Sequence, residues 1–418
     1  MAVQTLLHST PRSRITVGAV LLAIGVLMFL LFTPSAEPGQ TAKFGMNLTS
    51  SAAIKIPDLI LPVQVSLYVL SFVIVFLGAF QMARGIRSTG ALFGMVSFAF
   101  VAAFLIWATK GSSLSLIGML SSSLVRATPI ALAALCGVIS ERAGVTNIAI
   151  EGIMLIAAQT SVVTATLSHS LYVGLVVGIL TGGLVAAFHA FLSIRYKVDQ
   201  IVSGVAINIF ATGATSFISS KYLQHQGELL NNSGTFPIIS IPLLSKIPIL
   251  GPIFFENNLV VYLMMLIVIV MHIVLFYTPW GLRTRAVGEH PKAADTLGIN
   301  VFFVRYVNVI VGGMIAGLGG AYFTLGSVGR FDEVMTAGKG FIGLAAMIFG
   351  NWNPIGAFTS SLIFGFADSL QVKMQILAVP IPSSILAMAP YIVTMIVLTG
   401  VVGRAIPPAA DGTAYEKQ

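Results

Sequence analysis

The chain has 418 residues, of which 56% are hydrophobic and only 9% are charged, whereas a soluble domain carries about 25% charged residues. So few charges cannot cover a globular surface in water, which excludes an ordinary soluble protein. The net charge of +8 does not indicate nucleic-acid binding, because the basic residues stand singly or in pairs at the ends of apolar runs. Cys136 is the only cysteine, which excludes an intrachain disulfide and a cysteine-based zinc site.

Apolar runs of membrane-spanning length recur along the chain, and they predict helices because lipid offers the backbone no hydrogen-bonding partner. The first run follows Arg12 and Arg14 and is predicted to be a retained span, since the apolar core of a cleaved signal peptide is usually shorter. The stretch "FGNWNP" (349–354) interrupts a later run and predicts a broken element. The predicted fold class is an all-α, polytopic integral membrane protein with about 10–12 transmembrane helices, broken helices included. The predicted spans are 15–33, 62–83, 91–109, 115–139, 148–167, 171–192, 201–220, 259–278, 302–326, 340–350 with 354–371, and 384–403.

The distribution of arginine indicates that both termini lie in the cytoplasm. Ten arginines then lie on the inner side and one, Arg330, lies on the outer side. The lysines show the opposite bias, with more of them, including Lys339, on the outer side. Two predicted outer loops are long, 34–61 and 221–258. The second is either a docking surface or a loop that closes over the bundle. The tail from Pro407 is polar and is predicted to be disordered.

Glycine pairs at G-x-x-x-G spacing occur in two of the predicted spans. Gly178 with Gly182, and Gly313 with Gly317, are predicted to let helices approach closely. The sequence contains no G-x-x-x-x-G-K-[ST] motif, so ATP binding through a P-loop is not expected in this chain.

The stretch "ERAGVTNIAIEG" (141–152) concentrates polar groups between two apolar runs. Glu141 and Arg142 are predicted to form a solvated or mutually paired turn at the inner face. Gly144 and its β-branched neighbours predict a helix break. Asn147 and Glu151 lie four residues apart and are predicted to share one face of the following helix. An ionisable residue in a span is costly unless it faces a cavity or a partner, so Glu151 is predicted to point inward.

Two interpretations of these polar residues stay open. Asn147 and Glu151 can line a substrate path and bond ribose hydroxyls or base edges. Alternatively, Glu151 pairs with an internal cation, for which Arg126 is the candidate, and only locks helices together. Asn208 in an apolar helix needs a partner, on the path or on a neighbouring helix, and Asn351 in the second break is a weaker path candidate. The dispersed histidines predict no metal site, and no cofactor is expected.

The segment "WGLRTRAVGEHPKAADTLGI" (280–299) is the longest polar stretch on the predicted inner side. Residues from Pro291 to Leu297 predict a short helix that Gly298 can end. The pair Ala293–Ala294 offers a flat patch for close docking. This segment resembles the cytoplasmic coupling segment of ABC-importer permeases of the ribose and branched-chain amino acid type, although Lys292 stands where the related EAA loop has glutamate.

Three further stretches strengthen this resemblance: "ERAGVTNIAIEGIMLIAA" (141–158), "YKVDQIVSGVAINIF" (196–210) and "GFIGLAAMIFGNWNPIGAFTSSLIFGFADSLQ" (340–371). Together they are similar to the subgroup that imports nucleosides with a lipoprotein receptor. The resemblance covers roughly 115–405. It implies an N-terminal extension with about three spans (1–110), a permease core (111–405), a coupling segment (279–300) and a polar tail (406–418).

The resemblance also implies a permease subunit in a bacterial inner membrane that is not itself an enzyme. Its partners would be ABC ATPase subunits, a second related permease, a substrate-binding lipoprotein and a small-molecule substrate, with no nucleic acid. The residues implied to couple to the ATPase are Arg283, Arg285, Glu289, Ala293, Ala294 and Gly298. The alternatives are an ABC permease for a simple sugar or a branched-chain amino acid, or an ion-coupled secondary transporter that uses Glu151.

Overall fold

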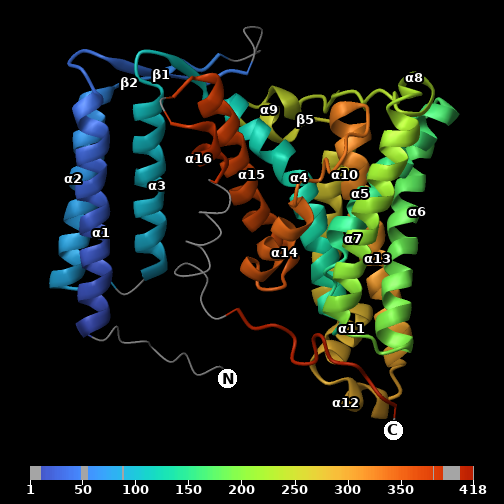
Figure 1. Cartoon of the computed structure of the whole chain (residues 1–418). Helices are drawn as coiled ribbons and strands as arrows, with labels where there is room; N and C mark the ends of the chain where they lie inside the picture. The colour runs from blue at the N-terminus through green and yellow to red at the C-terminus, as the bar shows by residue number, and fades with distance from the viewer. Residues whose placement is uncertain (1–10, 49–54, 87–88, 380, 389–404, 418) are drawn as a thin grey trace. The chain divides into compact units, whose positions relative to one another are not determined.

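The computed structural model describes residues 11–48, 55–86, 89–379, 381–388 and 405–417. These form two compact units (Figure 1). Within the described residues, ten helices are long and apolar enough to cross a membrane, which confirms the predicted polytopic helical fold. The last predicted span, 384–403, lies outside the described residues from 389 onward; α16 (Ser383–Ala387) falls at its start.

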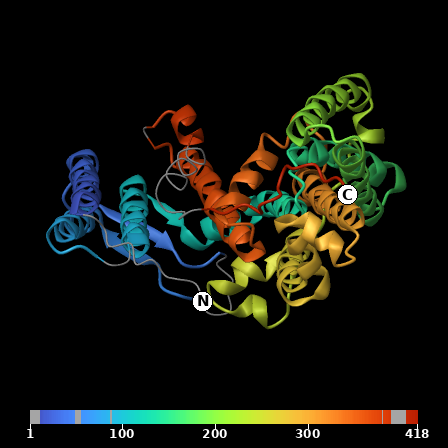
Figure 2. The same cartoon turned by 90° about the horizontal axis from the view of Figure 1, so that it is seen from below.

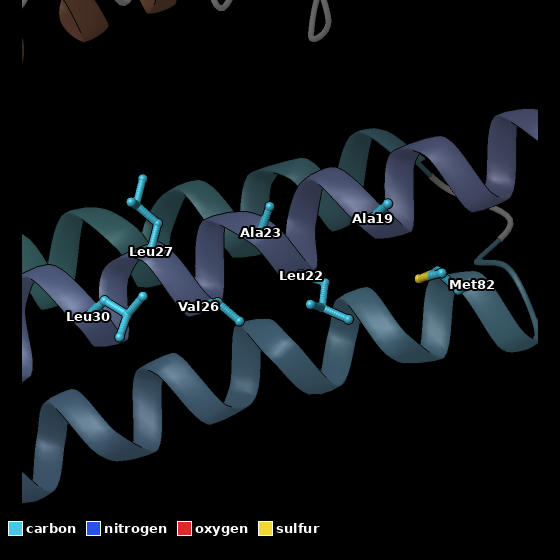
Figure 3. Close-up of a pocket in the computed structure, with 7 residues that line it drawn as sticks. All are labelled: Ala19, Leu22, Ala23, Val26, Leu27, Leu30 and Met82. Carbon is cyan, nitrogen blue, oxygen red and sulfur yellow. The ribbon is translucent and has the colours of Figure 1, made fainter.

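The first unit holds residues 1–119 together with 246–249 and 371–386. Its long helices are α1 (Pro11–Phe32), α2 (Val63–Ala83) and α3 (Thr89–Ala108). A Cβ added to Gly78 on α2 would lie 2.7 Å from the backbone nitrogen of Leu22 on α1, so these two helices touch along their backbones. An apolar hollow of about 450 Å³ lies along them (Figure 3). Its lining residues carry no polar side chain, so the hollow offers no chemistry of its own.

A small sheet at the ends of these helices was not predicted. It has the order β2–β1–β3, with β1 (Thr41–Gly45) antiparallel to β2 (Leu59–Pro62) and parallel to β3 (Ser113–Ser115). The strands are only three to five residues long and lie in polar loops. They therefore lack the sustained alternation that would have distinguished them from loop sequence.

The second unit holds residues 120–245, 250–370 and 387–418. Its long helices are α4 (Leu116–Glu141, whose first residues belong to the first unit), α5 (Ile150–Ser168), α6 (Leu171–Ala190), α7 (Gln200–Ile218), α10 (Leu259–Tyr277), α13 (Val301–Phe323) and α15 (Pro354–Ile376, whose last residues belong to the first unit). Three shorter helices at its polar turns are α11 (Pro279–Glu289), α12 (Pro291–Thr296) and α14 (Lys339–Phe349). Single π-helical turns extend three of the long helices: η2 (Phe191–Arg195), η3 (Ser219–Leu223) and η5 (Thr324–Val328). Its remaining short elements are α8 (Gly227–Leu230), β4 (Ile239–Ser240), α9 (Leu250–Phe254) and β5 (Glu256–Asn257). The first unit holds η1 (Thr33–Ser35) and the last residue of η4 (Leu244–Lys246).

The predicted glycine seam joins α6 to α13. A Cβ at Gly182 would lie 2.4 Å from the carbonyl oxygen of Gly313, and a Cβ at Gly317 would lie 2.5 Å from the carbonyl oxygen of Gly178. Both distances are far below normal carbon–oxygen contact, so no larger residue fits while the helices keep this separation. This confirms the packing role predicted for both glycine pairs.

Both predicted helix breaks are present. α4 ends at Glu141 and α5 begins only at Ile150, with Gly144 at a φ of +78° between them. α14 ends at Phe349 and α15 begins at Pro354, with Asn351 at a φ of +53° in the turn. A non-helical stretch, 329–338, also precedes α14 (Figure 1). Irregular backbone in a membrane protein needs internal partners for its polar groups, and these partners make up the candidate site.

The prediction of a disordered tail is wrong. The backbone nitrogen of Ala410 donates to the carbonyl oxygen of Gly288 at 2.8 Å, and Nη1 of Arg305 donates to the carbonyl oxygen of Thr413 at 2.9 Å. Tyr415 is buried, and its ring centroid lies 5.3 Å from that of Phe302. The tail therefore packs along the end of the unit that carries α11 and α12 (Figures 1 and 2). Polar composition was misleading because the groups that bind the tail are buried loop and helix residues.

Candidate functional site

Glu151 joins the start of α5 to the start of α14. Its Oε1 accepts hydrogen bonds from Thr336 Oγ1 at 2.6 Å and from the Gly338 nitrogen at 2.8 Å, and its Oε2 accepts one from the Gly340 nitrogen at 2.7 Å. A helix N-terminus carries unpaired N–H groups and partial positive charge, which a carboxylate neutralises. Glu151 is buried, with 8% of its surface exposed. The alternative in which Glu151 pairs with an internal cation, with Arg126 as the candidate, is wrong in its partner: peptide N–H groups and a hydroxyl take that place.

Asn147 does not share a face of α5 with Glu151, because α5 begins three residues after it. Its Oδ1 accepts from the Ala149 nitrogen at 3.1 Å, and its Nδ2 lies 3.6 Å from the sulfur of Cys136. The side chain is fully buried. In this conformation Asn147 stabilises the turn that leads into α5, and its predicted substrate contact stays a prediction.

Asn208 on α7 reaches across to the same turn. Its Oδ1 accepts from the Gly152 nitrogen at 2.8 Å, while its Nδ2 donates to the carbonyl oxygen of Ile148 at 2.8 Å. One amide thus satisfies a free donor and a free acceptor at the N-terminus of α5. This is the interhelical alternative left open by the sequence, with backbone groups as the partners.

Glu141 and Arg142 are neither freely solvated nor paired with each other. Oε2 of Glu141 accepts from Nε1 of Trp352 at 2.6 Å, and Arg142 donates to the carbonyl oxygens of Trp352 at 2.9 Å and Asn351 at 3.1 Å. Partial burial lowers the pKa of Arg142 below its ordinary value. The prediction failed because the turn after α14, with its two left-handed residues, presents carbonyl groups that loop sequence does not reveal.

Asn351 is exposed in that turn. Its Oδ1 accepts from the Ile406 nitrogen at 3.1 Å, which ties the turn between α14 and α15 to the tail. Its place beside Arg142, Glu141 and the tail puts it at the predicted inner end of the unit. Its predicted role in the path stays a prediction.

A second charged cluster was missed. Oδ2 of Asp368 on α15 lies 3.2 Å from Nη1 of Arg126 on α4 and 3.0 Å from Nζ of Lys339, the first residue of α14. Lys339 is therefore an internal cation and not the outer-loop residue that was predicted. The available signal was Asp368 itself, a single carboxylate within a long apolar run, which needs a cationic partner.

The predicted coupling segment forms α11 and α12. Pro291 occupies the first turn of α12, the Ala293 nitrogen donates to Nδ1 of His290 at 3.1 Å, and Gly298 follows the helix at a φ of +80°. This confirms the predicted short helix. The flat Ala293–Ala294 patch is half wrong: Ala293 is exposed, whereas Ala294 is buried with Val287 and Val301.

The exposed residues of the segment are both charged and apolar. Arg283 and Glu289 are exposed, as is Gly298, and Arg285 lies with its guanidinium 5.2 Å from the ring centroid of Phe276. Leu297 is 82% exposed and Leu282 is 63% exposed. Two exposed leucines therefore lie within this largely polar segment.

Asp411 links the tail to the break after α4. It accepts a hydrogen bond from Oγ1 of Thr146 at 3.0 Å, and the carboxyl group of Glu141 lies near it. The guanidinium of Arg305 is a nearby charge. Burial raises the pKa of Asp411 above its ordinary value. The tail therefore bridges the coupling segment and the broken helix α4–α5. Among the described residues, no group of three or more His, Cys, Asp or Glu side chains could hold a metal ion.

Residues 119–403 match the family described as "Branched-chain amino acid transport system / permease component". The chain is 43% identical over 308 residues to the nucleoside ABC transporter permease protein NupC of Lactococcus lactis subsp. cremoris, covering 72% of this chain and 96% of that protein. It is 43% identical over 307 residues to the guanosine ABC transporter permease protein NupQ of Bacillus subtilis, covering 71% and 95%. It is 37% identical over 265 residues to the putative glucose ABC transporter permease protein TsgC13 of Haloferax volcanii, covering 62% and 79%.

No solved structure gives a significant match to the chain. The family match covers well over half of the sequence, and its members are membrane subunits that work with ATPase and substrate-binding partners and do no chemistry themselves. The ten apolar helices agree with a multi-pass protein of the bacterial inner membrane. The chain therefore belongs to the branched-chain amino acid transport permease family and is a permease subunit of an ABC importer.

Proposed function

We propose that this permease imports nucleosides. The observation that supports this most strongly is the 43% identity to two permeases named for nucleoside and guanosine transport, over 95–96% of their lengths. The similarity to a putative glucose permease is lower and covers less of that protein. A substrate without net charge also suits a unit in which buried Glu151 and partly buried Asp368 are already bonded to protein groups.

The proposed importer contains two ATPase subunits, a second related permease and a substrate-binding lipoprotein. The first contact with an ATPase is assigned to the exposed face of α11 and α12, with Arg283, Glu289, Ala293 and Leu297. Charged rim groups around an apolar centre are the composition of a protein interface. Arg285 and Ala294, which face inward, connect this surface to α10 and α13.

Movement of the coupling segment has two routes into the spans. Ala294 packs with Val301 at the start of α13, and the glycine seam passes displacement of α13 to α6. The tail is the second route: its bond to Gly288 and its contacts with Thr146 and Asn351 reach both helix breaks. Nucleotide-driven movement of α11 would therefore displace the ends of α4, α5 and α14 together. Asn147, Glu151, Asn208 and Asn351 are the residues at which we propose the path opens.

Uptake of labelled guanosine and adenosine by cells with and without the gene tests this proposal. Unlabelled ribose, glucose and leucine serve as competitors, and an uncoupler is added in a parallel assay. Gene-dependent uptake that only nucleosides inhibit, and that survives the uncoupler while ATP is present, is expected. Inhibition by glucose, ribose or leucine would mean that the substrate is a sugar or an amino acid and not a nucleoside. Loss of uptake together with the proton gradient would favour an ion-coupled mechanism through Glu151.

A further inference from the structure

Two long helices of the second unit, α4 and α15, and the shorter helix α14 bring two cations to one carboxylate. Nη1 of Arg126 and Nζ of Lys339 lie 3.2 and 3.0 Å from the same oxygen, Oδ2 of Asp368. These three side chains together carry one positive charge in excess, while the carboxylate of Glu151 is bonded to the peptide nitrogens on either side of Lys339. A buried ion pair is usually matched in charge, because an uncompensated ion in a low-dielectric region is costly. A matched pair would need only one of these cations.

Close helix packing fixes the geometry of the cluster. A Cβ at Gly365 would lie 2.3 Å from the carbonyl oxygen of Ser123, so the backbones of α15 and α4 touch one turn from Asp368 and Arg126. A Cβ at Gly343 would lie 2.4 Å from the Cβ of Ala133, which brings α14 equally close to α4. The bonds from Glu151 to Gly338 and Gly340 hold the first turn of α14, where Lys339 begins the helix. Groups held this rigidly are suited to recognise a ligand with little loss of entropy.

Arg126 is the accessible member of the cluster. Its side chain is 36% exposed, although 83% of the most apolar 18-residue stretch of α4 is buried. Asp368 and Lys339 are 14% and 18% exposed. An arginine on a membrane span is stable only if it faces water or a polar partner. The guanidinium has five N–H donors and no acceptor. Oδ2 of Asp368 accepts a hydrogen bond from Nη1.

We propose that Arg126, supported by Lys339, recognises the O6 and N7 edge of a 6-oxopurine nucleoside as it crosses the membrane. This rests on the nucleoside import proposed above. Guanine and hypoxanthine present two adjacent acceptors on that edge, which the forked donors of arginine fit. Adenine replaces one acceptor with an amino donor, so a donor would face a donor. The excess positive charge strengthens bonds to acceptors and needs no anionic substrate.

Competition between guanosine and adenosine for uptake tests the proposal. The variants are Arg126→Lys, which keeps the charge without the fork, and Arg126→Gln. The matched control is Arg330→Gln, since Arg330 forms an exposed ion pair with Asp332 outside the spans. In both Arg126 variants, guanosine uptake relative to adenosine should fall about tenfold, the discrimination expected of a bidentate arginine contact. Adenosine uptake should continue, which shows that the variant is folded and inserted, and the control should keep the wild-type ratio.

Three results would overturn the proposal while leaving nucleoside import intact. One is a wild-type protein that does not prefer guanosine or inosine over adenosine. Another is an unchanged ratio in both Arg126 variants. The third is an equal loss of both nucleosides at normal membrane abundance, which would assign the cluster to helix packing. A wild-type protein that imports no nucleoside at all would overturn the proposed function itself, and this proposal with it.

Discussion

The anchoring of α14 by Glu151 gives the sharpest test of the structure. The carboxylate accepts three hydrogen bonds, from Thr336, Gly338 and Gly340. A hydrogen bond to a charged group contributes about 1.5–3 kcal/mol, so replacing Glu151 with leucine should cost on the order of 5 kcal/mol. Glu151→Gln keeps one acceptor oxygen but turns an NH₂ group toward a donor, and should cost about 2 kcal/mol.

The assay is thermal unfolding of the purified protein in detergent, with uptake measured in cells. Both variants should unfold at lower temperature, Glu151→Leu by the larger margin. Glu333→Gln is the control, because Glu333 is exposed and bonded only to Gln224 among the described contacts. A Glu151→Leu protein as stable as wild type would refute the anchoring. A Glu151→Gln protein of wild-type stability that has lost uptake would instead place Glu151 on the substrate path, whereas full uptake with unchanged preference would exclude it from the path.

Three further predictions concern packing, coupling and docking. Gly182→Leu should abolish accumulation of the protein in the membrane, because the leucine side chain would meet the backbone of α13. Gly213→Ala should be tolerated, because nothing lies within 4 Å of the added Cβ. Immunodetection in membrane fractions measures both variants, and a normal level of Gly182→Leu would contradict the close packing of α6 on α13. Asp411 has a raised pKa in the folded chain, so its contribution to stability is full at pH values below its unfolded pKa and is lost as the pH rises through the folded pKa. Asp411→Asn should remove this loss of stability with rising pH from the pH profile of thermal unfolding, and should lower uptake per ATP hydrolysed. An unchanged profile would count against the bridge formed by the tail. Leu297→Asp should weaken co-purification of the ATPase without changing thermal stability, since Leu297 is 82% exposed. Leu243→Asp serves as control because Leu243 is 78% exposed, and equal recovery of the ATPase with both variants would argue against docking at Leu297.

The sequence predicted the features that follow from composition and local pattern. Spans, the two breaks, the glycine seam and the helix that begins at Pro291 all depend on hydrophobic length, small residues or turn chemistry within a few positions. The family resemblance rested on such contiguous stretches and was confirmed by the family match over residues 119–403.

The partners of the polar residues could not be predicted, because each lies far away in the chain. Glu151 is bonded to residues 185 to 189 positions away, and Arg126 finds Asp368 at a separation of 242. Only helix packing decides which acid meets which cation. The tail was misjudged for the same reason, since Thr413 meets Arg305 and Asp411 meets Thr146 from distant positions.

ATP-driven transport by the purified importer tests the central claim most directly. The permease would be reconstituted in proteoliposomes with the ATPase, second permease and lipoprotein from its own importer, and accumulation of labelled guanosine would be followed with and without ATP. The account predicts ATP-dependent accumulation that unlabelled nucleosides inhibit and that ribose, glucose and leucine do not. Accumulation without ATP, or ATP-dependent accumulation of a sugar or an amino acid in place of guanosine, would contradict it.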